Sequence, residues 1–243
     1  MKENKYDDPK FFEQYASMAR SKLGLSGAGE WYALKKMLPD FLGRRVLDLG
    51  CGFGWHCQYA AAGGARSVVG TDISKKMLAV AEEKNEYPAV VTYRALPMEE
   101  LDFPAESFDV VISSLALHYV ESFSDIAASV ARVLTRGGTF VFSTEHPVFT
   151  AREPQGWICD GETRLHWPVD RYFSEGERDM IFLGEHVKKY HRTVETFVSA
   201  LLSAGFAITG LREPRPSPDF ASFPDYPDEL RRPMFLLLSA KKR

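Results

Sequence analysis

Three glycines at alternate positions follow an acidic residue in the first half of the chain. In the segment VLDLGCGFGW, residues 46–55, Asp48 lies inside an apolar run, and Gly50, Gly52 and Gly54 come after it. The apolar run predicts a buried strand, and the residues after the loop predict a helix. Glycines at a strand–loop–helix junction let a ligand approach backbone N–H groups that the helix leaves unpaired. The spacing therefore predicts a small-molecule site at the end of this strand.

The loop departs from the pattern that binds nicotinamide dinucleotides. That pattern is Gly-x-Gly-x-x-Gly, and its third glycine would stand where this chain has Trp55. Asp48 would also repel a pyrophosphate, because like charges raise the energy. A ligand with an ammonium, a carboxylate and a sulfonium fits better, since Asp48 can hold the ammonium and the loop around Cys51 can hold the carboxylate. This ligand is S-adenosylmethionine. A nicotinamide-dependent oxidoreductase is the less favoured hypothesis for the function.

A second carboxylate supports the same cofactor. Asp72 ends the next apolar run in the segment GTDIS, 22 residues after Gly50. A carboxylate at this point is expected to accept hydrogen bonds from both hydroxyls of a ribose. Ile73 and Met77 follow it and would supply apolar contact for the adenine.

The motifs Asp48 to Gly54 and Gly70 to Ser74 resemble those of the class I S-adenosylmethionine-dependent methyltransferases, and more narrowly their type 11 small-molecule branch. The similarity continues through 103–120 and 134–147 and covers roughly residues 40–147. It implies an α/β, Rossmann-like sheet of seven mostly parallel strands in the order 3-2-1-4-5-7-6, with the last strand antiparallel and helices on both faces. It also implies transfer of a methyl group to a small-molecule acceptor by in-line displacement.

The adenine site departs from the family pattern. Members of the family often carry an acidic residue after the third strand, where this chain has Arg94, Ala95 and Leu96. Backbone groups of Ala95 or Leu96 could hold the adenine instead, or the side chain of Glu99 could. Ser113 and Ser114 close the fourth predicted strand, at the end where a methyl donor would meet its acceptor.

Three histidines are candidates for catalysis, because a neutral imidazole can take a proton from a hydroxyl acceptor. His146 ranks first since it directly follows the fifth predicted strand, and His191 and His118 rank lower. Each of the three could equally be structural. No residue is an unambiguous catalyst, so a module that binds S-adenosylmethionine without catalysis stays as an alternative.

The periodicity of the chain predicts the elements that must position these residues. Residues 1–40 are expected to form an N-terminal helical cover over the open edge of the sheet, with helices at 10–24 and 28–39. Residues 145–190 lack clear periodicity and are expected to be an insertion or lid that contributes to the acceptor pocket. The remaining elements are strands at 46–49, 67–71, 90–93, 108–114, 138–144, 206–212 and 233–242, and helices at 54–63, 74–85, 122–135 and about 193–205.

The composition of the chain limits the kinds of partner that are expected. The 243 residues carry a net charge of −3, with both signs mixed along the chain, so no broad basic surface for nucleic acid is expected. The three cysteines have no metal-ligand spacing, and the carboxylates Asp160, Glu162 and Asp170 have no fixed place near the fourth strand, so no metal is expected. No secretory signal or membrane span is recognised, which predicts a cytoplasmic protein. The oligomeric state stays open.

Overall fold

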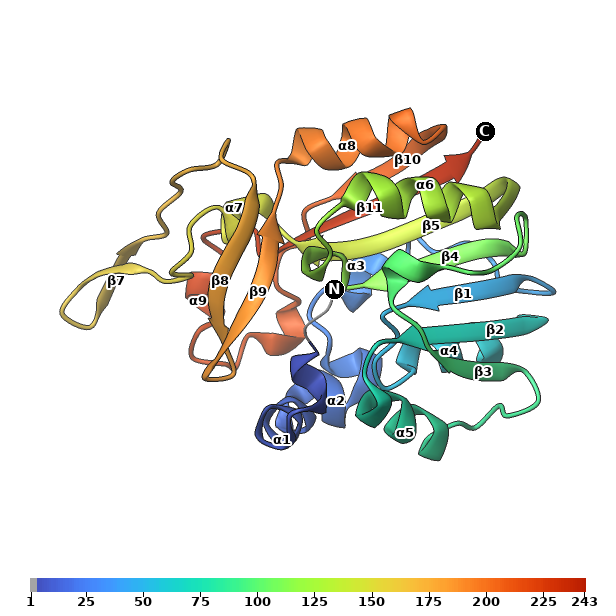
Figure 1. Cartoon of the computed structure of the whole chain (residues 1–243). Coiled ribbons are helices and arrows are strands. Elements are labelled where there is room, and N and C mark those ends of the chain that lie inside the picture. Colours follow the sequence, from blue (N-terminus) through green and yellow to red (C-terminus); the bar gives the residue numbers. More distant parts are fainter. Residues whose placement is uncertain (1–3) are drawn as a thin grey trace.

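A computed structural model describes residues 4–243, and its centre is a twisted seven-stranded sheet (Figure 1). The order across the sheet is β3-β2-β1-β4-β5-β11-β10, in which β11 pairs antiparallel with both of its neighbours. This confirms the order 3-2-1-4-5-7-6 expected from the sequence. The strands are β1 Arg45–Leu49, β2 Ser67–Asp72, β3 Val91–Ala95, β4 Phe108–Ser114, β5 Leu134–Glu145, β10 Phe206–Arg212 and β11 Phe235–Lys242.

Helices cover both faces of the sheet. On one face α6 (Phe123–Val133) and α8 (Val194–Ser203) bury a core that includes Phe123, Phe142 and Phe197. On the other face α4 (Trp55–Ala62) packs against β1 and β2, and α5 (Lys75–Glu83) packs against β2 and β3. Apolar side chains on both faces explain why the central strands are nearly continuous hydrophobic runs.

The N-terminal segment differs from the two long helices expected from the sequence. It forms α1 (Pro9–Ser17), α2 (Ala19–Lys22) and α3 (Trp31–Leu34). The chain breaks at Met18, which is extended with φ −65° and ψ 152°, and again at Gly24, whose φ is +61°. The expectation that this segment covers the open edge of the sheet is also wrong, because side chains of α1 and α2 lie at the carboxyl ends of the strands and line a cavity there.

The boundary between α6 and β5 also differs from the sequence prediction. The helix ends at Val133, and the next residues already pair with β4, with Leu134 opposite Phe108 and Thr139 opposite Val110. Gly137, with φ +75°, lies in an irregular stretch of this strand and does not end the helix. The twelve-residue β5 therefore runs from the amino end to the carboxyl end of the sheet, and Glu145 is its last residue.

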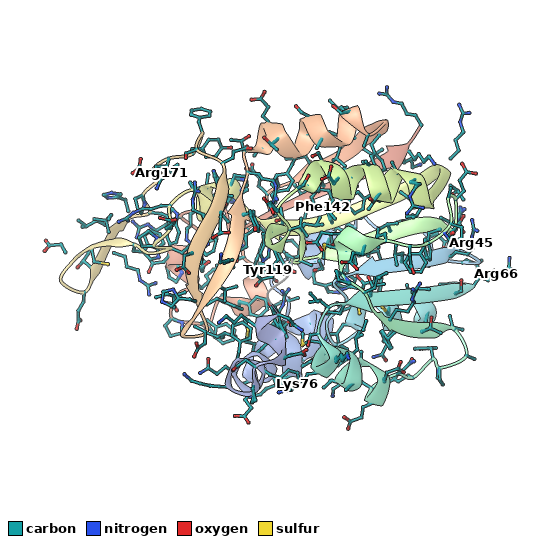
Figure 2. The ribbon with its side chains drawn as sticks, in the orientation of Figure 1. Arg45, Arg66, Lys76, Tyr119, Phe142 and Arg171 are labelled. Atoms are coloured by element: carbon teal, nitrogen blue, oxygen red, sulfur yellow. The ribbon has the colours of Figure 1, made fainter. Side chains whose placement is uncertain are left out.

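Residues 145–190 contain more regular structure than their sequence suggests. They form α7 (Pro147–Thr150) and two antiparallel hairpins. One hairpin joins β6 (Ile158–Asp160) to β7 (Thr163–His166), and the other joins β8 (Gly176–Phe182) to β9 (Glu185–His191). With the short helix α9 (Tyr226–Glu229), they lie beyond the carboxyl end of the sheet (Figure 1). Figure 2 marks the opposite, amino end of the sheet by Arg45 and Arg66.

Candidate active site

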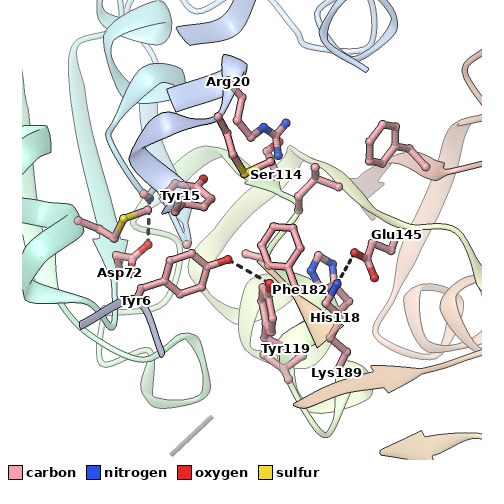
Figure 3. A pocket seen from close by; sticks show the side chains of 18 of the residues that line it. Tyr6, Tyr15, Arg20, Asp72, Ser114, His118, Tyr119, Glu145, Phe182 and Lys189 are labelled. Atoms are coloured by element: carbon pink, nitrogen blue, oxygen red, sulfur yellow. Dashed lines mark hydrogen bonds and ion pairs between the residues drawn. The ribbon is translucent and has the colours of Figure 1, made fainter. Parts of the chain in front are cut away.

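A cavity of about 530 Å³ lies at the carboxyl ends of β1, β2, β4 and β5. Parallel α/β sheets bind ligands at this end, where the strands give way to loops. Its walls come from the strand ends and the loops that follow them, the N-terminal segment through Tyr6 and Tyr15, and the β8–β9 hairpin through Phe182 and Lys189 (Figure 3). Phe149 of α7 and Gln155 also line the cavity.

The glycine loop forms one wall through Gly50 and Gly52. Both have a positive φ, +70° and +54°, which side chains with a Cβ rarely adopt. A Cβ at Gly50 would overlap the Cβ of Ala116, so the loop and the residues after β4 approach each other as backbone. A Cβ at Gly54 would overlap the hydroxyl of Tyr93, and Gly54 itself does not line the cavity.

Asp72 lines the cavity at the end of β2 and also shapes the loop. Its Oδ2 accepts a hydrogen bond from the backbone N–H of Gly52 at 2.9 Å, and its Oδ1 accepts one from Ser74 at 2.9 Å. Burial raises the pKa of Asp72 above its ordinary value, although these hydrogen bonds oppose the shift. Each carboxylate oxygen has two lone pairs, so both oxygens retain one for a ligand. The residue is thus able to hold a pair of adjacent hydroxyls.

Asp48 and Cys51 lie beneath the loop and do not line the cavity. Asp48 is 1% exposed, its Oδ2 accepts from the thiol of Cys57 at 3.4 Å, and its Oδ1 has no partner. Burial raises the pKa of Asp48 to about 7. The backbone N–H groups of Gly50 and Cys51 both donate to the carbonyl of Thr71, so they hold the loop to β2. In this structure Asp48 is therefore separated from the cavity by the loop.

Apolar side chains fill the space beside Asp72. Ile73, Met77 and Leu96 line the cavity, together with Met98 and Glu99. The N–H of Leu96 donates to the carbonyl of Asp72 at 3.0 Å, so it is already used by the end of the sheet. Ala95 pairs with Asp72 within the sheet and does not line the cavity. An adenine placed here would contact Leu96 through its side chain and meet Glu99 at its polar edge.

The two serines at the end of β4, Ser113 and Ser114, lie in different environments. Ser113 is fully buried, and its hydroxyl donates to the carbonyl of Leu49 at 2.9 Å. Ser114 lines the cavity and shares a 3.1 Å hydrogen bond with Ser143. Because successive side chains of a strand point to opposite faces, only one of two neighbouring serines can reach the same cavity wall.

Of the three candidate histidines, only His118 lines the cavity. It lies on the 3-10 turn Leu117–Tyr119 after β4. His146 instead caps α7, accepting the N–H of Val148, and bonds Glu213 at 2.8 Å. His191 bonds the hydroxyl of Thr150 and the carbonyl of Tyr172, both at 2.8 Å. The structure does not bring His146 and His191 to the cavity.

The far end of the cavity holds charged side chains that the sequence analysis missed. Glu145, at the end of β5, pairs with Lys189 of β9 at 2.5 Å, and the Lys189 side chain is 2% exposed (Figure 3). Arg20 pairs with Glu30 at 2.5 Å, and Glu30 accepts a longer bond from Ser114 at 3.5 Å. Glu145 could have been found from the sequence, since it is an acidic residue that directly ends a buried strand.

Burial and charge set the protonation states at this end. Burial lowers the pKa of His118 to about 3, so its imidazole is neutral near pH 7. Burial alone would raise the pKa of Glu145, but the charge of Lys189 and the hydrogen bonds from Lys189 and Gln155 bring it below its ordinary value. The Nδ1 of His118 and the Oε2 of Glu30 are buried without a hydrogen-bond partner. The arrangement is a neutral imidazole beside a carboxylate, both facing the same space.

A Rossmann-like sheet with a glycine loop and an acidic second strand end defines a nucleoside-binding protein. Residues 47–142 match the model of the family described as "Methyltransferase domain". An uncharacterized protein from Haemophilus influenzae is 33% identical over 98% of this chain and 96% of its own length. A solved structure from Listeria monocytogenes, assigned to the S-adenosylmethionine-dependent methyltransferases, is 53% identical over 90% of this chain and 99% of its own, with a TM-score of 0.86. A methyltransferase of the same class from Mesorhizobium loti is 46% identical over 90% and 100%, with a TM-score of 0.83.

The chain belongs to the S-adenosylmethionine-dependent methyltransferases, and its cofactor is S-adenosylmethionine. Relatives that match only about half of this chain have names that refer to different acceptors. A tRNA U34 carboxymethyltransferase from Methylococcus capsulatus is 36% identical over 47% of this chain and 36% of its own length. A ubiquinone biosynthesis O-methyltransferase from Agrobacterium fabrum is 34% identical over 51% and 49%. The comparisons therefore leave the acceptor open.

Two features of residues 4–243 bear on other functions. None of their helices is both long and apolar enough to span a membrane. They also contain no group of three or more His, Cys, Asp or Glu side chains arranged to hold a metal ion.

Proposed function

We propose that this protein methylates a small-molecule acceptor, and that the acceptor binds between Ser114 and the Glu145–Lys189 pair. The observation that carries the proposal is the shape of the cavity, which continues from Asp72 past the end of β4 to a region walled by Phe182, Lys189 and the N-terminal segment. A volume of about 530 Å³ lies within the range of about 300–1,000 Å³ typical of small-molecule sites. A tRNA acceptor would need an open basic approach to this region.

The residues beside the strand ends fit the cofactor. Asp72 would accept the two ribose hydroxyls, and Ile73, Met77 and Leu96 would contact the adenine. Gly50 and Gly52 line the cavity without a side chain, and a Cβ at Gly50 would overlap the Cβ of Ala116. When bound, S-adenosylmethionine supplies an electrophilic methyl carbon on a sulfonium.

The remaining residues would orient the acceptor and handle its proton. Neutral His118 can accept a hydrogen bond or a proton from an acceptor that lies beside Ser114. The hydroxyls of Tyr6 and Tyr119, which both line the cavity, share a hydrogen bond of 3.0 Å that joins the N-terminal segment to the turn after β4. Holding two reactants in line can supply about 7–11 kcal/mol of the barrier, so positioning can account for much of the rate.

The test follows the label from methyl-labelled S-adenosylmethionine. The purified protein is incubated with separate small-molecule, RNA and protein fractions of a bacterial extract. Label in the small-molecule fraction, with an equal amount of S-adenosylhomocysteine formed, is the expected result. Label in RNA would contradict the proposal. Cofactor binding with no label in any fraction would favour the alternative, a binding module without catalysis.

Asp72→Ala should weaken S-adenosylhomocysteine binding by about 1–3 kcal/mol, because the ribose hydroxyls lose their acceptor. Calorimetry measures this loss directly. Asp109→Asn is the control, since Asp109 pairs with Arg45 at the amino end of the sheet at 3.0 Å and has no contact with the cavity. Equal affinities for wild type and Asp72→Ala would show that the ribose is held elsewhere.

A further inference from the structure

Buried carboxylate oxygens at the acceptor end have hydrogen-bonding capacity that the protein does not use. Lys189 uses Oε1 of Glu145, while Oε2 of Glu145 has only a 3.5 Å contact with the amide of Gln155. Glu30 accepts Arg20 through Oε1, and its Oε2 has no partner although the residue is only 1% exposed. A buried acceptor without a donor destabilises the folded protein by about 1–3 kcal/mol. A ligand that donates a hydrogen bond to this acceptor would remove that unfavourable free energy.

The walls around these carboxylates are aromatic. Phe182 lines the cavity, and the ammonium of Lys189 already lies 5.0 Å from its ring centroid and 6.0 Å from that of Tyr119. Tyr6 and Tyr15 form the opposite wall, at a ring distance of 5.2 Å from each other (Figure 3). Aromatic faces attract cations and pack against apolar groups. The same walls therefore suit an ammonium attached to an apolar body.

A second cavity of about 920 Å³ adjoins the first and is acidic. The two share Tyr6, Pro97, Glu99 and Tyr119 as wall residues. Among its lining residues within 4–243 are five carboxylates and two lysines, namely Glu99, Glu100, Glu121, Asp125 and Glu177 with Lys5 and Lys188. A cleft with an excess of one sign raises the local concentration of ligands of the opposite sign. Cations are therefore favoured and anions disfavoured in the cavity that adjoins the candidate active site.

We infer that the acceptor is a primary or secondary amine with an apolar body, bound as its ammonium between Glu145 and the aromatic walls of the cavity. This inference rests on the proposed function and names its substrate class. Before methylation one N–H bond of the ammonium breaks, its electron pair stays on nitrogen, and the proton passes by way of the carboxylate of Glu145 to solvent. Lys189 holds the other oxygen of Glu145 and fixes the carboxylate in place.

Calorimetry with three probes of similar size tests the inference. The protein, saturated with S-adenosylhomocysteine, is titrated at pH 7.5 with 2-phenylethylamine, 2-phenylethanol and 3-phenylpropanoate. The amine should bind at least tenfold more tightly than the alcohol, and the carboxylate should bind most weakly. Tighter binding of the alcohol or the carboxylate, or no binding of the amine, would overturn the inference. The labelling experiment above tests the proposed function separately, whatever the result here.

Variants assign the effect to the carboxylate. Glu145→Gln should reduce amine affinity at least tenfold and change alcohol affinity less than twofold. Lys189→Met should tighten amine binding, because it frees a second oxygen of Glu145, whereas it would abolish binding of an anion. Glu153→Gln is the control, since Glu153 is an acidic residue of the same insertion that does not line the cavity. Unchanged S-adenosylhomocysteine affinity shows that each variant is folded, and the probe series on wild type decides the outcome if a variant does not fold.

Discussion

At the scale of single residues, position relative to the end of a strand decides what a side chain can reach. Asp48 is the second-last residue before the glycine loop, and its carboxylate lies beneath that loop beside Cys57. Asp72 is the last residue of β2, and its carboxylate reaches the cavity. The sequence indicated both as cofactor residues because both types and spacings fit. It could not separate them, since the direction of each side chain depends on how the loop folds back over β1.

The buried carboxyl of Asp48 predicts a specific pH dependence of stability. Burial raises its pKa from 3.8 to about 7 in the folded protein, so the folded state holds a proton that the unfolded chain has lost between these values. Stability from this group is present below pH 3.8 and is lost as the pH rises through 7. Asp48→Asn removes this dependence. As the pH rises from 4 to 8, the unfolding free energy of wild type should therefore fall by up to about 4 kcal/mol relative to that of Asp48→Asn. Chemical denaturation of ligand-free protein measures the difference.

Asp109→Asn serves as the control for this pH series. A hydrogen bond from Arg45 lowers the pKa of Asp109 to about 2, so its contribution is lost only as the pH falls from 3.8 through 2. The difference between Asp109→Asn and wild type should therefore stay constant from pH 5 to pH 8. A constant difference for Asp48→Asn over the same range would mean that Asp48 is already ionised at pH 5.

At the scale of elements, the glycine loop depends on close approach as well as on backbone conformation. Gly50 and Gly43 both have positive φ, +70° and +71°. A Cβ at Gly50 would overlap Ala116, whereas a Cβ at Gly43 would have no atom within 4 Å. Gly43→Ala should therefore cost about 1–2 kcal/mol from backbone strain alone. Gly50→Ala should cost more and should weaken S-adenosylhomocysteine binding at least tenfold, because the loop must move away from Ala116.

Thermal unfolding and calorimetry on the two alanine variants check this prediction. Each variant is compared with wild type in the presence and absence of S-adenosylhomocysteine. Gly43→Ala should retain wild-type affinity, because Gly43 does not line the cavity. If both variants lose the same stability and keep the same affinity, the loop does not depend on its contact with the residues after β4.

Regular elements were predictable, and the residues that join them were not. The bounds of β4 and β10 agree with the sequence prediction at 108–114 and 206–212, because apolar runs of this length between turn residues fix a buried strand. His118 reaches the cavity through the short turn after β4, while His146, which directly follows β5, turns away to cap α7. Nothing in the local sequence distinguishes these two outcomes. The sequence did not indicate Lys189 as a site residue either. In the structure Val187, Lys189 and His191 form the buried face of β9.

At the scale of the whole molecule, the cavity is assembled from segments far apart in the chain. Asp7 near the N-terminus accepts a hydrogen bond from the hydroxyl of Ser74 at 2.6 Å and one from the N–H of Lys76 at 3.2 Å, which fastens the N-terminal segment to the start of α5 beside Asp72. Lys10 pairs with Glu185 at 2.8 Å and joins this segment to the β8–β9 hairpin. Figure 2 shows Tyr119 between the hairpin and the N-terminal helices. The cavity is lined by residues from the N-terminal segment, α5 and the β8–β9 hairpin.

Ligand binding should therefore protect the N-terminal segment and the glycine loop together. A ligand that binds only the folded state stabilises it by about 2.7 kcal/mol at one hundred times its dissociation constant, and segments that contact the ligand gain most when they otherwise open locally. Hydrogen exchange with and without S-adenosylhomocysteine measures this. Amides in residues 4–22 and 50–54 should exchange at least tenfold more slowly with ligand. Amides of the β6–β7 hairpin, whose residues do not line the cavity, should not change. Protection confined to residues 50–54 would show that the N-terminal segment does not close over the bound cofactor, and the acceptor would then have a wider entrance than the structure gives it.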